Sequence, residues 1–458
     1  MHRVQPPEWL ARRALRERRM ANGKRVKTGK KKQWATPKAR LERLTHERDR
    51  KMARSPHAYV RGSTARFYEW LDEADVNLPQ GPAIWICGDC HTGNLGPLAD
   101  AHGHVDVLIR DLDQTVIGNP VHDLIRLALS LASAARGSAL SGLTIIHMLE
   151  ALTHGYMAAF DRGDGKADPE FGQSRGKSHG TKNGKGRDKS HNGQAQNERP
   201  EIVDLIMRRA VKRSWKHLAL ERIEDIRPKI PLGRRFWPLS ATEQKQIDAL
   251  FQLDTIASLA TSLRGRPNDG AVEVLDAAYW VKGCSSLGRL RYAVLLDVDG
   301  GVVQGDDLCL MDLKEGVKAA APRYAGVRMP RDNAERVVTG ARHLSPSLGE
   351  RMRAARLLDR SIVIRELLPQ DLKLEIDTLT QHDAAEVAQY LGGVVGHAHA
   401  RQMDDATCRE WLADLQRNRS KTIDSPVWLW NSVVQLTSEH EAAYLEHCKR
   451  LFSGDGPG

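Results

Sequence analysis

The chain has 458 residues, of which 41% are hydrophobic, and it carries a formal net charge of +11. Such a chain is long enough to bury a globular core, and it contains no run of 18 apolar residues that would predict a membrane span. Its start, residues 1–32, is too charged for a secretory signal, and six cysteines in no recognisable framework suit a reducing compartment. We therefore expect a cytoplasmic protein with no membrane partner.

The positive charge raises the question of nucleic-acid binding, because clustered Lys and Arg gain affinity for polyphosphates by releasing counterions. Much of the excess lies in a basic arm, residues 1–50, and in a polar stretch, residues 162–199. Blocks of like charge are usually solvated. We interpret both segments as tails that favour solubility, and binding of nucleic acid through them stays a second hypothesis.

The first half of the chain predicts a strand-loop-strand unit followed by helices. The expected elements are, in order, the entry to the folded part at 56–72, strands at 83–86 and 105–109, and helices that begin after Pro120 and cover 143–160. From 162 to 199 the sequence is Gly, Ser, Lys, Asn and Gln with almost no apolar residue. This composition predicts a disordered insert, because it cannot offset the entropy of ordering.

The second half predicts helices, then a small antiparallel sheet, then helices again. The expected elements are helices at 202–220 and 241–263, strands at 277–281, 291–296 and 308–313 with a turn at Gly300 and Gly301, a helix capped near Asp332 or Asn333, a strand at 361–367, a helix from about Ala384, and a helical tail over 404–452.

The densest chemistry lies in the loop Gly88-Asp89-Cys90-His91-Thr92-Gly93-Asn94 and in the later Asp111-Leu112-Asp113. Phosphoryl transfer needs a carboxylate that orients the attacking hydroxyl and oxygen ligands that hold magnesium on the nucleotide phosphates. Asp89 is the candidate base, and Asn94 and Asp111 are the candidate metal ligands. Asp113 either assists the metal or caps the next turn. We interpret His91 as a residue that shapes the loop.

The stretch 88–131, with its GDxHxxN loop, second Asp and Gly-Asn-Pro-Val-His-Asp-Leu helix start, resembles the core of aminoglycoside phosphotransferases and related small-molecule kinases. The wider chain, over most of 45–403 without the insert, resembles the bacterial family DUF2252. The resemblance implies a two-lobed, protein-kinase-like α+β fold that uses ATP and magnesium to phosphorylate a hydroxyl acceptor. It also implies that Asp123 is a structural acid that anchors the loop.

The residues that would bind the nucleotide follow the catalytic loop, whereas ordinary kinases place them before it. The glycine-rich stretch 283–288 is the candidate phosphate loop, although a plain hairpin fits it equally well. Lys314 is the candidate strand lysine, Glu335 its ion-pair partner, and strand 363–367 the hinge that faces adenine. The nucleotide-binding set is Gly283, Ser285, Ser286, Gly288, Lys314, Glu335 and Glu366.

This order of motifs predicts a circular permutation. The expected domains are the basic arm 1–50, a catalytic-loop part of the C-lobe at 51–161, the insert 162–199, a helical segment 200–270, a nucleotide-binding N-lobe at 271–368 and the helical remainder of the C-lobe at 369–458.

Several other hypotheses stay open from the sequence. The chain could be a nucleotide-binding pseudokinase, an enzyme that transfers AMP in place of phosphate, or a basic binding module. The motif Cys87-Gly-Asp-Cys90-His91 also matches c-type haem attachment, and its two cysteines suit zinc. Finally, Asp89 and Asp111 could be loop-capping acids of an unrelated α/β fold.

Overall fold

The structure is a computed structural model that describes residues 36–74, 76–100, 102–161, 199–212, 229–261, 271–283, 287–298, 308–368, 370–371, 380–417 and 424–453. The chain divides into the units Met1–Thr36 and Pro37–Gly458. All the helices and strands described below belong to the second unit. Four predicted features lie outside the described residues: most of the basic arm, all of the insert but Arg199, the tip of the phosphate loop at 284–286, and the turn at Gly300 and Gly301.

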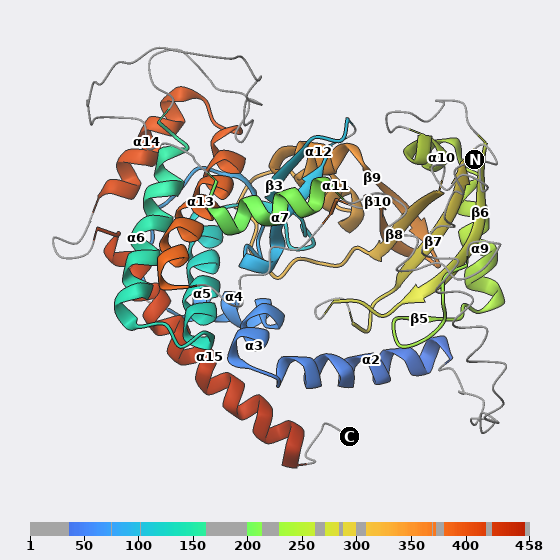
Figure 1. Ribbon diagram of the computed structural model, residues 1–458, viewed down its shortest axis with the longest axis horizontal. Coiled ribbons are helices and arrows are strands. Elements are labelled where there is room, and N and C mark those ends of the chain that lie inside the picture. Colours follow the sequence, from blue (N-terminus) through green and yellow to red (C-terminus); the bar gives the residue numbers. More distant parts are fainter. Residues whose placement is uncertain are drawn as a thin grey trace, which may run out of the picture. The chain divides into compact units, whose positions relative to one another are not determined.

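Short strands and long helices form the first part of the second unit (Figure 1). The elements are α2 (Pro37–Met52), α3 (Pro56–Gly62), α4 (Thr64–Glu73), β1 (Ile84–Ile86), η1 (Thr92–Asn94), β2 (Leu95–Ala99), β3 (Val105–Ile109), β4 (Val116–Gly118), α5 (Val121–Gly137) and α6 (Gly142–Ala158). Strand β1 pairs with β4, and β2 pairs with β3, both antiparallel. The loop between β1 and η1 is therefore anchored by two small ribbons.

A six-stranded antiparallel sheet forms the next part, in the order β5-β6-β7-β8-β10-β9. Its elements and the helices around it are α7 (Glu201–Val211), β5 (Phe236–Trp237), α9 (Ala241–Phe251), α10 (Asp254–Thr261), β6 (Val272–Trp280), β7 (Arg291–Val298), β8 (Leu308–Glu315), α11 (Asn333–Leu344), α12 (Pro346–Glu350), β9 (Met352–Leu357) and β10 (Arg360–Leu367). Strands β6, β7 and β8 form a meander, and β10 returns beside β8 after α11 and α12.

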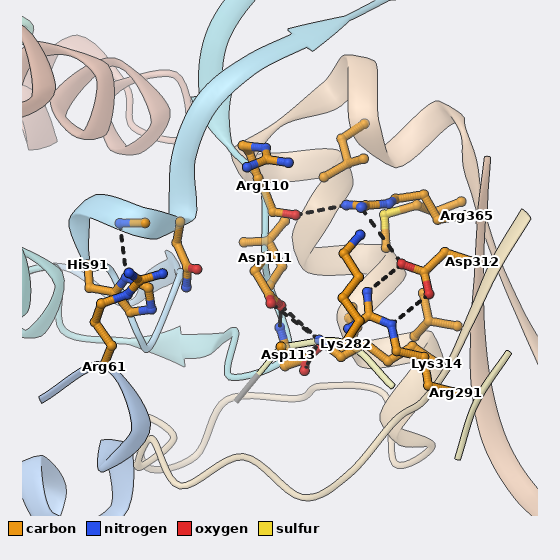
Figure 2. A pocket seen from close by; sticks show the side chains of 18 of the residues that line it. Arg61, His91, Arg110, Asp111, Asp113, Lys282, Arg291, Asp312, Lys314 and Arg365 are labelled. Carbon is orange, nitrogen blue, oxygen red and sulfur yellow. Dashed lines mark hydrogen bonds and ion pairs between the residues drawn. The ribbon is translucent and has the colours of Figure 1, made fainter. Parts of the chain in front are cut away.

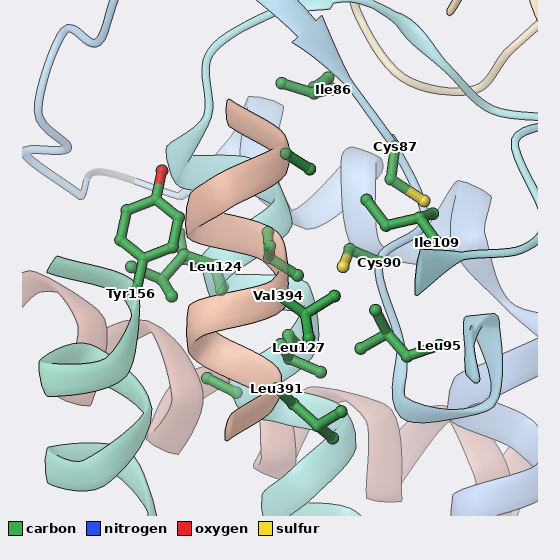
Figure 3. Close-up of a cluster of buried hydrophobic side chains, with 14 of the residues drawn as sticks. Ile86, Cys87, Cys90, Leu95, Ile109, Leu124, Leu127, Tyr156, Leu391 and Val394 are labelled. Carbon is green, nitrogen blue, oxygen red and sulfur yellow. The ribbon is translucent and has the colours of Figure 1, made fainter. Parts of the chain in front are cut away.

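Three helices complete the chain: α13 (Gln381–Ala400), α14 (Asp405–Gln416) and α15 (Val427–Ser453). Helix α13 packs along α6, and its buried stripe fills the core next to the β1 loop (Figure 3). The two helices touch at glycines. A Cβ on Gly155 of α6 would overlap the carbonyl oxygen of Gln389, and one on Gly392 of α13 would overlap that of Leu152. Helix α13 is thus fixed against the segment that carries the predicted catalytic loop.

The predicted mixture of helix and sheet is confirmed at the level of an α+β fold, and the strands at 105–109, 291–296, 308–313 and 361–367 appear within a few residues of their expected bounds. The prediction of a single helix over 241–263 was wrong, because the chain forms two helices there, α9 and α10, with a break between Phe251 and Asp254. Strands β2, β4, β5 and β9 were missed. Gly96 and Pro97 weaken the strand signal of β2, and Ala and Arg weaken that of β9. Among the described residues, no helix has the length and apolar character that a membrane span requires.

We expect Gly155→Ala to lower the free energy of unfolding by about 2–3 kcal/mol or more, because the new methyl group meets the backbone of α13 and forces the helices apart. Gly142→Ala, at an open position of the same helix, is the matched control and should change it by less than about 1 kcal/mol. Denaturant unfolding of both variants measures the difference. Equal stabilities would show that the α6–α13 contact is not close.

Candidate functional site

A cleft of about 460 Å³ lies where the six-stranded sheet faces the β1–η1 loop, the end of β3 and helices α2 and α3. Its walls carry eight basic and three acidic side chains, so they hold a strong excess of positive charge. The basic residues are Lys51, Arg54, Arg61, Arg110, Lys282, Arg291, Lys314 and Arg365, and the acids are Asp111, Asp113 and Asp312. A cleft of this size and charge fits a small anionic ligand such as a nucleotide.

Lys314, near the end of β8, joins the sheet to the segment that follows β3 (Figure 2). Its Nζ lies 3.2 and 3.3 Å from the two carboxylate oxygens of Asp111, and it also forms an ion pair with Asp113. Arg336 of α11 fixes the same segment by donating to the carbonyl oxygens of Asp113 and Thr115. The sheet lysine and the two aspartates, which are 201 to 203 positions apart in the sequence, thus meet in one ion cluster.

The two aspartates have opposite pKa shifts. Burial works to raise the pKa of Asp111, but the charges of Lys314, Arg291 and Arg365 outweigh it and hold the pKa well below its usual range. The pKa of Asp113 is raised, because burial and the negative charge of Asp111 outweigh the attraction of Lys314. The side chain of Asp111 is also the more open of the two, with 40% exposed against 16% for Asp113. Asp111 is therefore the carboxylate that stays ionised and available to a cation.

The face of the sheet that lines the cleft carries charges at alternate strand positions. Strand pairing sets Arg291 opposite Lys314 and Arg365 opposite Asp312. Arg291 binds Asp312 through two hydrogen bonds of 2.9 and 2.5 Å, and Arg365 lies 3.9 Å from the same carboxylate. Asp312 is thus neutralised by its neighbours, and this buried pair fixes the guanidinium groups along the cleft.

The β1–η1 loop is held from behind by the buried carboxylate of Asp123 on α5. Asp123 accepts hydrogen bonds from the backbone N–H groups of Cys87, at 2.6 Å, and of Gly88, at 2.9 Å, and it contacts His399 of α13. Gly88 has φ +73°, and a Cβ there would overlap the carbonyl oxygen of Gln114. Glycine is therefore required at the first position of the motif, and Asp123 makes the anchoring contact that was expected of it.

Asn94 presents an oxygen to the cleft beside Asp111. Its Nδ2 donates to the carbonyl oxygen of Asp89 at 2.9 Å, which leaves Oδ1 as the acceptor that can face a ligand. Both Asn94 and Asp111 line the cleft. One amide oxygen and one ionised carboxylate fit a magnesium ion, which prefers a few oxygen ligands and keeps waters in its remaining positions.

Asp89 lies behind the cleft wall and not in its lining. Its side chain is 10% exposed, and both oxygens are taken: Arg126 Nε donates to one at 2.8 Å, and Thr64 Oγ1 donates to the other at 2.8 Å. Arg126 is itself buried in α5 and also donates to the carbonyl oxygen of Val60. The predicted base is thus part of a buried ion pair.

His91 lines the cleft in front of Asp89, with Nε2 4.0 Å from the nearer Asp89 oxygen. Its Nδ1 accepts the N–H of Gly93, so the neutral ring carries its proton on Nε2. Burial lowers the pKa of His91 to about 3, against the attraction of Asp89 and with help from the charges of Arg61 and Arg126. The loop-shaping contact with Gly93 is as expected.

The glycine-rich stretch 283–288 is only partly within the described residues. Gly283 lines the cleft with φ +80°, and its carbonyl oxygen accepts from Lys51 Nζ at 2.9 Å. Gly288 has φ +87° but packs against α2, outside the cleft lining. Ser285 and Ser286 lie outside the described residues.

Neither predicted glutamate reaches the site. Glu335 is exposed on the first turn of α11, and the described partners of Lys314 are Asp111 and Asp113 instead. Glu366 points to the opposite face of the sheet, where it contacts Cys309. Its backbone N–H and C=O are both bonded to Arg351, so they offer nothing to an adenine ring. The expected pairing of Glu335 with Lys314 is therefore wrong among the described residues, and contact of Glu366 with nucleotide stays a prediction.

The ligand atoms of Cys87, Cys90 and Asp123 lie within 4.8 Å of one another, but their surroundings suit neither covalent haem nor an open metal site. Both cysteines are buried, and both carboxylate oxygens of Asp123 already accept backbone N–H groups. The hydrogen bond with Cys90 and burial raise the pKa of the Cys87 thiol, which favours the neutral form that metals do not bind. These groups form part of the core beneath the loop.

Sequence reasoning missed most of the charged lining, above all the cations Arg61, Arg291 and Arg365 and the acid Asp312. One signal was present. In β8 the charged residues Asp312 and Lys314 stand two positions apart among apolar ones, and β10 carries Arg365 after an apolar run; a charge inside a buried strand indicates a functional or paired group. For Arg61 no such signal exists, because α3 is short and its partner surface is set by the fold.

Comparison with known proteins identifies the family of the chain but indicates no activity. The model of a family described as an uncharacterized protein conserved in bacteria, DUF2252, matches residues 40–450. No curated protein and no solved structure matched the chain.

We expect stability to fall as the pH drops from about 6.5 toward 4, because His91 binds a proton readily when unfolded but not when folded. At pH 5 this residue alone contributes a loss of about 2 kcal/mol relative to pH 7. His91→Gln should reduce the slope of unfolding free energy against pH, whereas His154→Gln, at an exposed position of α6, serves as the control. An unchanged slope in His91→Gln would show that the ring titrates normally.

Proposed function

Because the chain belongs to the bacterial family DUF2252, whose description names no activity, we propose a function from the site: an ATP- and magnesium-dependent phosphotransferase of the protein-kinase-like type that acts on a hydroxyl acceptor. The observation that carries the proposal is the contact between Lys314 of the sheet and Asp111 after β3, with the Oδ1 of Asn94 on the same cleft. A phosphate-binding lysine and two metal ligands are what a kinase needs on facing walls.

In this proposal each charged group has a separate task. Asn94 Oδ1 and the carboxylate of Asp111 would hold magnesium, which neutralises the phosphate charge when bound. Lys314 would exchange part of its bond to Asp111 for a phosphate oxygen, and the backbone at Gly283 lies beside it at the cleft mouth. Asp113, which also pairs with Lys314, would keep the lysine in place while Asp111 turns to the metal.

The transfer step forms a bond from the acceptor hydroxyl oxygen to the terminal phosphorus and breaks the bond from that phosphorus to the bridging oxygen, so ADP leaves. In a loose transition state the hydroxyl proton leaves late, and a carboxylate mainly orients the hydroxyl. Asp89 can do this only if one of its oxygens exchanges Thr64 for the acceptor. The proton would then pass to Asp89, whose other oxygen stays hydrogen-bonded to Arg126.

The proposed permutation rests on the order of elements around the cleft. The segment with Asp89, Asn94 and Asp111 comes first, and the β6–β10 sheet with Lys314 comes later. After the sheet, α13 returns to pack on α5 and α6, next to the first segment. A chain that began at the sheet and ended at α7 would keep these contacts and would have the motif order of ordinary kinases.

A nucleotide-binding pseudokinase is the second candidate, and one observation favours it. Asp89 is held by Arg126 and Thr64 and is absent from the cleft lining, so its carboxylate is not presented to an acceptor. Release of ADP on addition of hydroxyl acceptors would separate the two candidates. Binding without turnover across a broad panel would favour the pseudokinase, and the mass added to a product would distinguish phosphate from AMP.

We expect Asp111→Asn to weaken binding of ATP in the presence of magnesium at least tenfold, because the variant lacks the charged metal ligand but keeps the side-chain shape. Lys314→Met should weaken it similarly and should also lower stability, since it leaves Asp111 and Asp113 without their counter-ion. Calorimetric titration measures both affinities.

Asp72→Asn is the matched control for this titration, since it removes the same charge from an exposed position of α4. Thermal unfolding of each variant separates loss of binding from loss of fold. Wild-type protein that binds no nucleotide, or an Asp111→Asn variant that binds it as well as wild type, would contradict the proposed function.

A further inference from the structure

The wall of the cleft opposite the sheet carries its own positive charge. Four residues of the α2–α3 segment line the cleft: Lys51 at the end of α2, Arg54 in the turn that follows, and Ala58 and Arg61 three residues apart on α3. Ala58 leaves room between the basic side chains. At this wall Arg61 lies beside His91 of the β1–η1 loop (Figure 2) and contacts Gly93.

Arg61 is the centre of this wall, and its guanidinium group is fixed against the loop. A Cβ built on Gly93 would overlap Arg61 Nη2 and lie 2.8 Å from its Cζ, so the guanidinium lies directly on the glycine backbone. Figure 2 shows Arg61 beside His91, across the cleft from Asp111. Any larger residue at position 93 would displace it. The glycine of the loop therefore serves to seat a cation.

The charge of Arg61 has no counter-ion within the described part of the chain. Its guanidinium forms no ion pair and no hydrogen bond with any of those residues. The acids of the cleft are committed elsewhere, Asp111 and Asp113 to Lys314 and Asp312 to Arg291. Arg54 adds a second cation on the same side. An anion from solution would stabilise a half-buried guanidinium in this position.

We infer that this wall binds the acceptor, and that the acceptor is a small molecule that already carries a phosphate group. The inference rests on the proposed function, because it assigns the sheet side of the cleft to the donor nucleotide. If the nucleotide phosphates lie at Lys314 and magnesium at Asn94 and Asp111, the next space along the cleft is bounded by His91, Gly93 and Arg61. A phosphate on Arg61 and Arg54 would direct the hydroxyl of the same molecule toward Asn94 and the donor phosphorus.

The geometry favours phosphate over a single carboxylate. The planar guanidinium of Arg61 offers two parallel donors, and Arg54 and Lys51 add positive charge to the same cleft. A dianion with three terminal oxygens can use several of these donors at once. Lys51 also donates to the carbonyl oxygen of Gly283. A ligand that binds Lys51 would therefore also lie near the candidate phosphate loop of the donor site.

The test is equilibrium dialysis with radiolabelled inorganic phosphate, in the presence of magnesium and a saturating non-hydrolysable ATP analogue. We expect wild-type protein to bind phosphate while the analogue is bound, and to bind acetate much more weakly. Arg61→Ala should weaken phosphate binding about tenfold or more, and Arg61→Lys should recover part of it. Arg66→Ala removes the same charge from α4, where Arg66 pairs with Glu439, and should leave phosphate binding unchanged.

Three results would overturn the inference: phosphate binding that Arg61→Ala leaves intact, acetate binding as strong as phosphate binding, or displacement of phosphate by the analogue. Displacement would mean that this wall serves the nucleotide itself. Failure of the proposed function looks different. If the analogue does not bind wild-type protein but phosphate still binds in an Arg61-dependent way, the donor site is wrong and the anion site stands.

Discussion

The ion cluster of Lys314, Asp111 and Asp113 determines how the two halves of this molecule meet. Lys314 comes from the middle of a six-stranded sheet, and the aspartates follow a two-stranded ribbon that belongs to the helical part. Removing the buried Lys314 would leave Asp111 and Asp113 without their shared counter-ion, which costs about 3–5 kcal/mol. Arg336 fixes the aspartate segment through carbonyl oxygens, so the cluster cannot relax by moving the backbone. The same charges that join the halves also create the cleft between them.

A second set of buried polar contacts shapes the loop on the other wall. Asp123 binds two backbone N–H groups, His399 connects it to Tyr156, and Tyr156 in turn accepts from Trp411. Satisfied networks of this kind are rigid, because each lost hydrogen bond would leave a buried polar group unpaired. The close glycine contacts of α6 and α13 hold this network from outside. The loop is thus preorganised, and it presents the Asn94 oxygen and the adjoining Arg61 guanidinium to a ligand.

Local sequence patterns were sufficient for the parts of this structure that depend on neighbouring residues. Strand 105–109, the cap at Asp332 and the helix after Pro120 all follow from periodicity and capping, and the structure has them. The meeting of Asn94, Asp111 and Lys314 in one cleft agrees with the motif spacing. What local patterns did not reveal depends on packing across long distances: Asp89 is hydrogen-bonded to Arg126, Glu335 faces solvent, and Glu366 contacts Cys309. No local pattern reports which face of a strand the fold turns to the cleft, nor that α3 would bring Arg61 to Gly93.

The central claim is that Asn94 and Asp111 hold the metal on which a nucleotide binds beside Lys314. The most direct measurement is anomalous diffraction from crystals grown with manganese and a non-hydrolysable ATP analogue. The account predicts one or more manganese peaks in contact with Asn94 Oδ1 and the Asp111 carboxylate, with phosphate density next to Lys314. Manganese or nucleotide bound elsewhere, with the Lys314–Asp111 contact intact and the cleft empty, would contradict it.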